Sequence, residues 1–265
     1  MFNKKIIFIA GAGRSGSTLL DITLGNMGDC FSLGELNFFV ENGILKNEYC
    51  SCGNRVMDCS FWGAIIFKWS RERKLSNEMF VDVQYKLIRN KRFFINLLTK
   101  PPYYDDYIHD IKKLYDIIFK ESGHNTLIDS SKNGNYIKIL KKISQKVEVV
   151  HLKRTFSGRY KSTQKHLKFN PSQGIEKEIK PMSFYYSFLT WYCDNFTVWF
   201  HSFGIKKTKV YYHDFITNPI SVISEILDIK NNEKELLKNR GPLFADHLVA
   251  GSRFRMNNKL FINKK

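Results

Sequence analysis

Four short apolar runs recur along the chain, and each is followed by a turn signal and a segment with a helical pattern. The runs are KKIIFIAG at 4–11, NTLIDSS at 125–131, KVEVVHLKR at 146–154 and TKVYYHDF at 208–215. Near-continuous, β-branched runs of this kind are typical of strands that are buried on both faces. Because they alternate with helical segments, they predict an α/β fold of three layers, α/β/α, around a central and mainly parallel sheet.

Two long segments between these runs predict further helices. The stretch at about 36–124 contains several basic or aromatic helical patterns, and we interpret it as a helical insertion that covers the site or helps to form it. The segment at 182–204 is rich in aromatic residues but includes Asp194 and His201, so we predict a buried helix and not a membrane span. Its aromatic side chains would belong to the core or line an acceptor pocket.

Asn218-Pro219 opens another helix, since proline is tolerated in a first turn. We expect one domain over residues 1–265.

The segment GAGRSGST at 11–18 lies between the first predicted strand and a predicted helix. Glycines let successive backbone N–H groups point inward, and a helix N-terminus adds its dipole and its free N–H groups. In this context the pattern predicts an anion-binding, P-loop-like turn, with a ligand-free Gly- and Ser-rich turn as the alternative. The candidate ligands are Arg14, Ser15, Gly16, Ser17 and Thr18.

One position separates this loop from those that bind nucleoside triphosphates. Ser17 stands where such a loop carries the lysine that reaches the β- and γ-phosphates, and the cation, Arg14, comes earlier. A kinase also needs an acidic Mg²⁺ ligand at the end of a neighbouring strand. Only Asp129 is placed for that role, and Lys132 stands close beside it. We therefore expect an anion that is held without an obligatory metal.

The charge of the chain favours an anionic partner but does not identify it. Lys and Arg outnumber Asp and Glu by 42 to 25, for a formal net charge of +17. Nucleic acid, a membrane surface and a small phosphorylated ligand all fit this balance, and so does a basic, solvated surface. No stretch reads as a membrane span, although peripheral membrane contact is open. No export signal is evident, so we expect a cytoplasmic protein.

Together with this loop, a second motif makes the chain resemble the sulfotransferases that use 3′-phosphoadenosine 5′-phosphosulfate (PAPS) as donor. GRSGSTLL is similar to the family's 5′-phosphosulfate loop, which has Arg or Lys at the position of Arg14. VVHLKRTFSGRYKST is similar to its second signature, in which a strand-end Arg and a Ser eight positions later grip the 3′-phosphate. These residues correspond to Arg154 and Ser162. The family usually has Asp-Pro after this Arg, whereas this chain has Thr155-Phe156.

The resemblance also implies catalytic roles. The segments GELNFF, LIDSSK, VYYHDFITNP and HLVAGSRFR resemble family segments in the same order along the chain. They imply Glu35 as the general base and Lys132, with Arg14, as the cations that stabilise the transferring sulfuryl group. From the residues alone, Glu35 is also explained as a carboxylate at a helix start, and Lys132 as a solvated lysine.

The C-terminal segment HLVAGSRFR resembles the part of the family that closes over the nucleotide. Arg253 or Arg255, with Ser252, would complete the site for the 3′-phosphate or the adenine. We prefer Arg253, because it follows Gly251 closely.

The cysteines do not form a recognisable framework. Cys50, Cys52 and Cys59 are close in sequence, but Cys-x-Cys is not the usual spacing of a zinc finger. A zinc site with Cys30 or a histidine as fourth ligand, a local disulfide and reduced structural thiols all remain open, and we favour the last two.

The leading hypothesis is a PAPS-dependent sulfotransferase that acts on a hydroxyl, or less readily an amine, of a carbohydrate, lipid or phenol. A P-loop kinase of a small metabolite is the second hypothesis, and it must explain the missing lysine. A basic nucleic-acid-binding protein is the third. We expect no nucleic-acid partner, because no helix-turn-helix, finger or RNP-type pattern is present.

Overall fold

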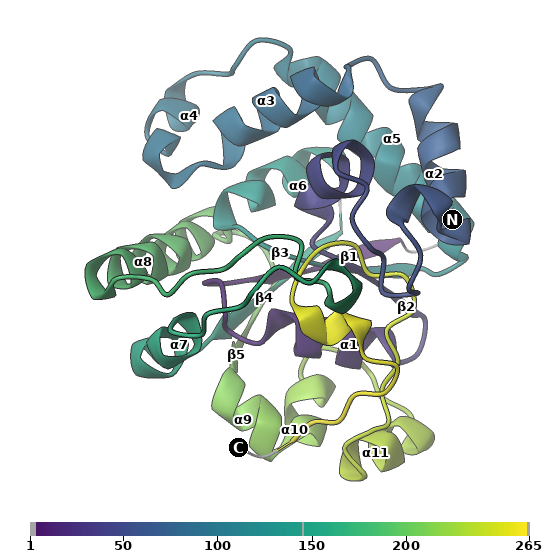
Figure 1. Ribbon diagram of the computed structural model, residues 1–265, viewed down its shortest axis with the longest axis vertical. Coiled ribbons are helices and arrows are strands. Elements are labelled where there is room, and N and C mark those ends of the chain that lie inside the picture. The colour runs from purple at the N-terminus through teal and green to yellow at the C-terminus, as the bar shows by residue number, and fades with distance from the viewer. Residues whose placement is uncertain (1–3, 145, 264–265) are drawn as a thin grey trace.

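A parallel five-stranded sheet forms the centre of the computed structural model, which describes residues 4–144 and 146–263. The strand order is β2-β3-β1-β4-β5, and every neighbouring pair is parallel. The strands are β1 (Lys5–Ala10), β2 (Cys30–Gly34), β3 (Thr126–Lys132), β4 (Val147–Lys153) and β5 (Lys207–Tyr211). Parallel neighbours bring the carboxyl ends of all five strands to one edge of the sheet (Figure 1), where open α/β sheets bind their ligands.

Helices cover both faces of this sheet, so the α/β fold with three layers and a helical insertion is confirmed. The side chains of β1 point alternately to the two faces of the sheet. Ile6 and Phe8 belong to the buried cluster on one face, and Ile7 and Ile9 to the cluster on the other. This alternation explains why the strand is apolar throughout, since each face buries its own residues. Burial of one such side chain is worth about 1.5–3 kcal/mol.

The helices are distributed between the two faces by their place in the chain (Figure 1). One face carries α2 (Ser60–Ser70), α3 (Asn77–Ile88), α5 (Tyr104–Ser122) and α6 (Ile137–Ile143), with the short α4 (Ile95–Leu98) beyond them. The other carries α1 (Ser17–Gly25), α9 (Tyr212–Thr217), α10 (Pro219–Ser224) and α11 (Asn231–Lys238). The remaining two, α7 (Phe156–Thr163) and α8 (Phe184–His201), extend from the side of β4 and β5.

The four predicted strands are present, and β2 is the strand that the apolar pattern missed. Its sequence, CFSLG, contains no β-branched residue and ends in glycine. Among the described strands it pairs with β3 alone and forms an edge of the sheet, where Gly34 makes one further parallel bridge to Val249 of the C-terminal segment. An edge strand needs fewer apolar residues than a central one, so its pattern was too weak to identify. The predicted helix at Pro219 is confirmed, and the Asn218 side chain caps it by accepting from the amide of Ser221.

The prediction of a buried helix at 182–204 was half wrong. The helix exists as α8, but most of its aromatic side chains are exposed, and Tyr185 is 85% exposed. Its buried residues are fewer and smaller: Ser187, Thr197, Val198 and His201. Among the residues that the structure describes, no helix combines the length and the apolar character needed to span a bilayer.

Candidate active site

The glycine loop lies at the carboxyl end of β1 and leads directly into α1. Gly11 and Gly16 both have positive φ angles, 150° and 99°. A Cβ atom on Gly16 would lie 2.4 Å from the Tyr212 ring, so no other residue fits there without displacement. Arg14 also has a positive φ, 68°, a conformation that a non-glycine residue adopts at a cost of about 1–3 kcal/mol. The tertiary structure therefore holds this cation in a strained conformation.

Two charged residues that the sequence reasoning did not assign support the loop from outside. Arg159 of α7 is buried and donates from Nε to the carbonyl of Gly13 at 3.0 Å. It also donates to Ser187 and Thr190 of α8. Asp194 of α8 lies near the amide of Gly13, and burial raises the pKa of its carboxyl. The one usable signal in the sequence was an acidic residue in an otherwise aromatic helix.

A cavity of about 530 Å³ lies in front of this loop. Its lining includes nine of the ten candidate site residues: Arg14, Gly16, Ser17, Thr18, Glu35, Lys132, Arg154, Ser162 and Arg253. The tenth, Ser15, is buried beside the cavity and does not line it; among the described residues its hydroxyl has no hydrogen-bond partner. The structure thus brings residues from five distant segments of the chain to one place.

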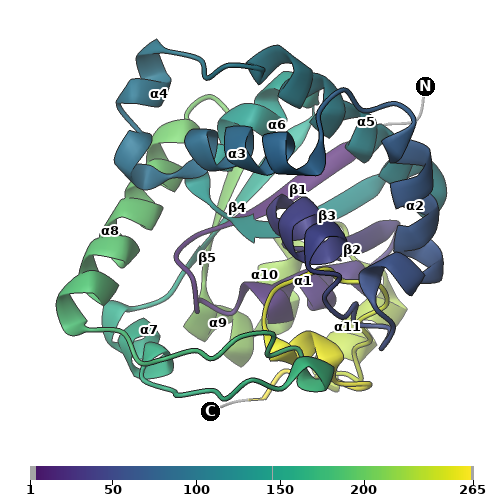
Figure 2. The same cartoon turned by 45° about the horizontal axis from the view of Figure 1, so that its top comes forward.

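Two segments form the outer wall of the cavity (Figure 2). They are far apart in the sequence but lie side by side in the fold. One is the connection between α7 and α8, with a short helical turn at Pro171–Gln173. The other is the C-terminal segment, with a turn at Arg253–Met256 that contacts the first. These segments contribute apolar side chains, namely Leu167, Ile175, Ile179, Phe254, Leu260 and Phe261.

The charge inside the cavity is strongly one-sided. Its lining carries one carboxylate, Glu35, and six basic side chains: Arg14, Lys132, Arg154, Lys165, Arg253 and Lys259. The ion pairs found among the described residues include Lys132 with Glu35 but none of the three arginines. Burial lowers the pKa of the Arg14 guanidinium, and the charge of Arg253 lowers it further, whereas Glu35 acts in the opposite direction. Mutually repelling, partly buried cations of this kind favour the binding of an anion.

Arg154 and Ser162 face the cavity from opposite ends of α7. Arg154 follows β4, donates to the carbonyl of Arg14 at 3.0 Å, and places its guanidinium 4.5 Å from the centre of the Tyr212 ring. The side chain of Thr155 caps α7 by accepting from the amide of Gly158 at 3.2 Å. Threonine is thus a competent N-cap at the position where the resemblance led us to expect aspartate.

Glu35 and Lys132 form an ion pair at the carboxyl ends of β2 and β3. Glu35 is 8% exposed, and its amide donates to the carbonyl of Val249 at 2.9 Å. Lys132 has a positive φ of 67°, which turns the chain away from β3 at the point where its side chain enters the cavity. The two side chains proposed for catalysis are therefore in contact, although 97 positions separate them in sequence.

Asp21 links the glycine-loop helix to both of these residues. Its carboxyl accepts from the amide of Gly34 at 3.1 Å and from the hydroxyl of Ser130 at 2.6 Å. Gly34 directly precedes Glu35, and Ser130 lies two positions before Lys132. Asp21 is fully buried, and burial raises the pKa of its carboxyl to about 8. This buried acid, which the sequence reasoning did not assign, connects α1 with the ends of β2 and β3.

The structure separates the two candidate arginines of the C-terminal segment. Arg253 is exposed and lines the cavity. Arg255 is 1% exposed and donates to the carbonyls of Gly251 and Tyr49 at 3.2 and 3.1 Å, and burial lowers the pKa of its guanidinium. Arg255 therefore joins two segments of the protein, whereas Arg253 is available to a ligand.

The fold and the cavity define an α/β protein with a glycine loop and a basic cavity at the carboxyl edge of a parallel sheet. A sequence model of the sulfotransferase family matches residues 7–231. The chain belongs to the sulfotransferase family, and this assignment confirms the resemblance of its two motifs.

Two solved sulfotransferases from mycobacteria share this fold at low sequence identity. The sulfotransferase STF9 from Mycobacterium avium is 12% identical, with a TM-score of 0.51 over 89% of this chain and 67% of its own. STF1 from Mycobacterium tuberculosis H37Rv is also 12% identical, with a TM-score of 0.51 over 90% and 72%. The sulfotransferase domain of the curacin biosynthetic pathway is 17% identical, with a TM-score of 0.48 over 87% and 76%. A search of curated proteins found no match.

Proposed function

We propose that this protein transfers a sulfuryl group from PAPS to a hydroxyl group of an acceptor. The observation that carries the proposal is the basic cavity, to which Arg14 and Arg154 contribute from two different strand ends, and in the described residues neither guanidinium forms an ion pair. A donor with anionic groups at both its 5′ and 3′ positions matches two cationic ends. PAPS is such a donor, and family membership supports the choice.

The residues of the cavity suggest how the donor is held. The amides and hydroxyls of Ser17 and Thr18, at the start of α1, would bind the 5′-phosphosulfate together with Arg14. Arg154 and Ser162 would bind the 3′-phosphate, since a forked guanidinium suits a phosphate dianion. The apolar outer wall would pack against the adenine, and Arg253 would close the cavity over it.

Chemistry at the sulfur requires a base, a stabilised leaving group and correct positioning. Glu35 would remove the proton of the acceptor hydroxyl while its oxygen forms a new bond to sulfur. The bond from sulfur to the bridging oxygen breaks, and Lys132 and Arg14 would stabilise the charge on the departing 3′-phosphoadenosine 5′-phosphate (PAP). By analogy with phosphoryl transfer, positioning and electrostatics should supply most of the rate. The contact between the side chains of Lys132 and Glu35 supports these roles, because it keeps both side chains on the same side of the cavity.

The structure weakens the kinase alternative. The carboxylate of Asp129, the one candidate Mg²⁺ ligand, is fully buried and accepts from the hydroxyls of Tyr115 and Ser131. Its hydrogen bonds direct it into the core below the insertion, so it would have to exchange these partners before it could reach a metal in the cavity. Nothing in the cavity favours ATP over a bisphosphorylated nucleotide.

The proposal is tested by nucleotide binding. We expect PAP to raise the melting temperature more than ATP does at the same concentration, because a ligand that binds only the folded state stabilises it. Arg154→Ala should weaken PAP binding by about 10- to 100-fold, the worth of one or two charge-assisted hydrogen bonds. The matched control is Arg71→Ala, which removes an exposed arginine at the end of α2. Equal PAP affinity in the two variants would refute the donor site.

Acceptor chemistry needs a separate screen. Carbohydrates, lipids, phenols and, as a lower expectation, amines are incubated with PAPS labelled in its sulfuryl group, and transfer of the label is measured. We expect transfer to a hydroxyl compound without added Mg²⁺. A requirement for Mg²⁺ and ATP, with label transferred from the γ-phosphate, would establish the kinase instead.

A further inference from the structure

Four potential metal ligands meet outside the cavity described above. Cys50, Cys52 and Cys59 lie on the segment that leads into α2, and His247 comes from the C-terminal segment. Their ligand atoms all lie within 4.8 Å of one another. His247 is separated from Cys59 by 188 positions, so the fold and not the local sequence brings the fourth ligand. Cys30, the other cysteine that the sequence suggested, lies on β2 and does not belong to the group.

We propose that these four residues bind a structural zinc ion. Three thiolates and one imidazole form one of the ligand sets that structural zinc sites use. The spacing of the atoms supports a tetrahedral site. With Zn–S bonds of about 2.3 Å and Zn–N bonds of about 2.05 Å, a tetrahedron separates two sulfurs by about 3.8 Å and a sulfur from a nitrogen by about 3.6 Å.

The measured separations agree with this geometry. The sulfurs of Cys50 and Cys59 are 3.8 Å apart. Nδ1 of His247 lies 3.3 Å from the sulfur of Cys59 and 4.0 Å from that of Cys50, on either side of the tetrahedral value. A disulfide between Cys50 and Cys59 would require about 2.05 Å between the sulfurs. The structure therefore has these cysteines as free thiols, at ligand distance and not at bond distance.

The backbone around the cysteines forms a tight turn followed by the start of a helix. Residues 50–53 form a tight turn in which the amide of Gly53 donates to the carbonyl of Cys50 at 3.0 Å. Cys59 stands at the N-cap of α2, where the helix dipole favours a negative charge.

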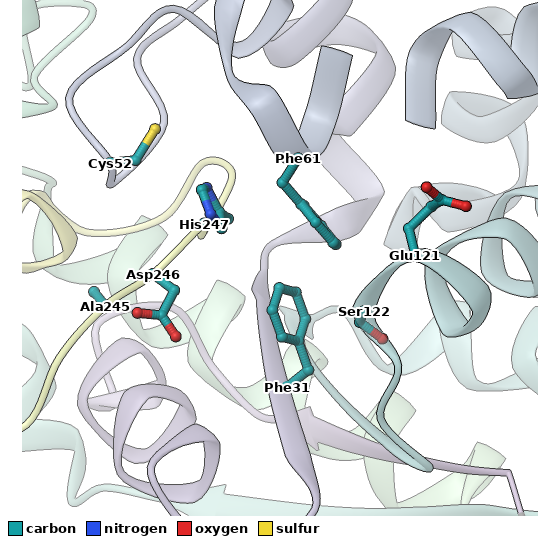
Figure 3. A pocket seen from close by; sticks show the side chains of 8 residues that line it. All are labelled: Phe31, Cys52, Phe61, Glu121, Ser122, Ala245, Asp246 and His247. Carbon is teal, nitrogen blue, oxygen red and sulfur yellow. The ribbon is translucent and has the colours of Figure 1, made fainter. Parts of the chain in front are cut away.

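Neighbouring contacts hold His247 in position. Nε1 of Trp62 donates to the carbonyl of His247 at 2.6 Å, and the ring of Phe61 stacks on its imidazole at 5.3 Å. The amide of Leu248 donates to the Ser51 hydroxyl at 2.7 Å. Figure 3 shows Cys52 and His247 on separate segments at the mouth of an open cleft, with Phe61 beside them. This cleft gives an ion a route to the group.

The zinc ion would have a structural role that reaches the donor cavity. Val249 follows His247 closely, and its carbonyl accepts from the amide of Glu35. The same segment continues to Arg253 in the cavity wall. A metal that joins residues 50–59 to His247 would therefore hold the C-terminal segment in place. This segment contacts the backbone of Glu35 and continues into the cavity wall at Arg253. The proposal does not depend on the identity of the sulfuryl donor.

The direct test is the metal content of the full-length protein. Protein purified under reducing conditions, without a metal-affinity step, is analysed by elemental mass spectrometry. We expect roughly one zinc ion per chain, and a lower melting temperature after chelation that returns on addition of zinc alone. A zinc content below a tenth of an ion per chain, unchanged after incubation with zinc and removal of the excess, would overturn the proposal. So would a Cys50–Cys59 disulfide identified in the reduced preparation.

Variants locate the ion. Cys52→Ser changes the exposed ligand and should leave the fold intact, yet it should lower zinc affinity by 10-fold or more. Cys193→Ser, on α8 and outside the group, is the matched control and should retain the full zinc content. Cobalt replacement gives a second readout that does not need activity. Its thiolate-to-cobalt charge-transfer band should weaken in Cys52→Ser and stay unchanged in Cys193→Ser. Equal bands in these two variants would place the metal elsewhere.

Discussion

The buried carboxyl of Asp21 predicts an unusual dependence of stability on pH. Asp21 is fully buried, and burial raises the pKa of its carboxyl to about 8. In the unfolded chain an aspartate has a pKa of about 3.9. Between these two values the folded protein keeps the proton on Asp21 while the unfolded chain releases it. The folded state therefore binds one more proton, and stability must fall as the pH rises through this window.

The magnitude follows from the same difference. Each pH unit inside the window costs about 1.4 kcal/mol of unfolding free energy. Between pH 5 and pH 8 the loss from Asp21 alone amounts to about 3.5 kcal/mol, because the slope flattens as the pH approaches the folded-state pKa. Other buried groups act in the lower part of this range. Burial raises the pKa of Asp129 to about 6, which acts in the same direction, and lowers the pKa values of His151 and His201 to about 4, which acts in the opposite direction.

The variant Asp21→Asn isolates the contribution of this carboxyl. The amide oxygen can still accept from Gly34 and Ser130, but the side chain no longer titrates. Urea unfolding of both proteins at pH 5, 6.5 and 8 gives the difference in unfolding free energy between wild type and the variant at each pH. The contributions of the other titrating groups are the same in both proteins and cancel in this difference. We expect wild type to lose about 3.5 kcal/mol relative to the variant between pH 5 and pH 8.

The control is Asp82→Asn, which changes an exposed carboxylate on α3. Its unfolding free energy should run parallel to that of wild type at all three pH values. If Asp21→Asn also ran parallel to wild type, the carboxyl would be ionised in the folded protein, and its position between α1 and the ends of β2 and β3 would need another explanation.

Three further predictions concern the proposed site. Glu35→Gln should reduce turnover by about 10²–10⁴-fold, the usual contribution of a positioned base, while the affinity for PAP measured by calorimetry stays within a few-fold of wild type; unchanged turnover would remove Glu35 from that role. Arg253→Ala should weaken PAP binding about 10-fold without lowering the melting temperature. Arg255→Ala should destabilise the protein by about 2–4 kcal/mol, because it removes a buried side chain that joins the carbonyls of Gly251 and Tyr49; the reverse pattern would exchange their assignments. Gly16→Ala should abolish detectable PAP binding, because the new methyl group meets the Tyr212 ring, and binding at wild-type affinity would contradict the loop geometry.

The local sequence pattern was sufficient to predict those elements whose residues are constrained by their own burial or backbone conformation. The central strands are apolar throughout because both of their faces are buried, and the glycine loop is recognisable because positive φ angles at its turns require glycine. The pairing of Arg154 with the loop followed from topology, since parallel strands end at the same edge of a sheet. The edge strand β2 escaped notice because five residues without a β-branched side chain resemble a loop.

Packing between distant segments decided what local pattern left open. The exposure of α8 was not predictable from its aromatic composition, because burial depends on what lies against a helix and not on its own residues. The contact of Arg159 with the loop and the position of Asp194 near it arise in the same way. Each depends on the side of the sheet from which a helix approaches, and residue spacing contains no information about that.

The sequence by itself therefore determined the class of fold, the glycine loop and the two cationic motifs, because each depends on residues that are neighbours in the chain. Only the tertiary structure decided that Lys132 contacts Glu35, that Arg253 and not Arg255 faces the cavity, and that His247 joins the cysteines at 50–59. These contacts join residues that lie far apart in the sequence. They form only when the strands, the insertion and the C-terminal segment meet at the same edge of the sheet.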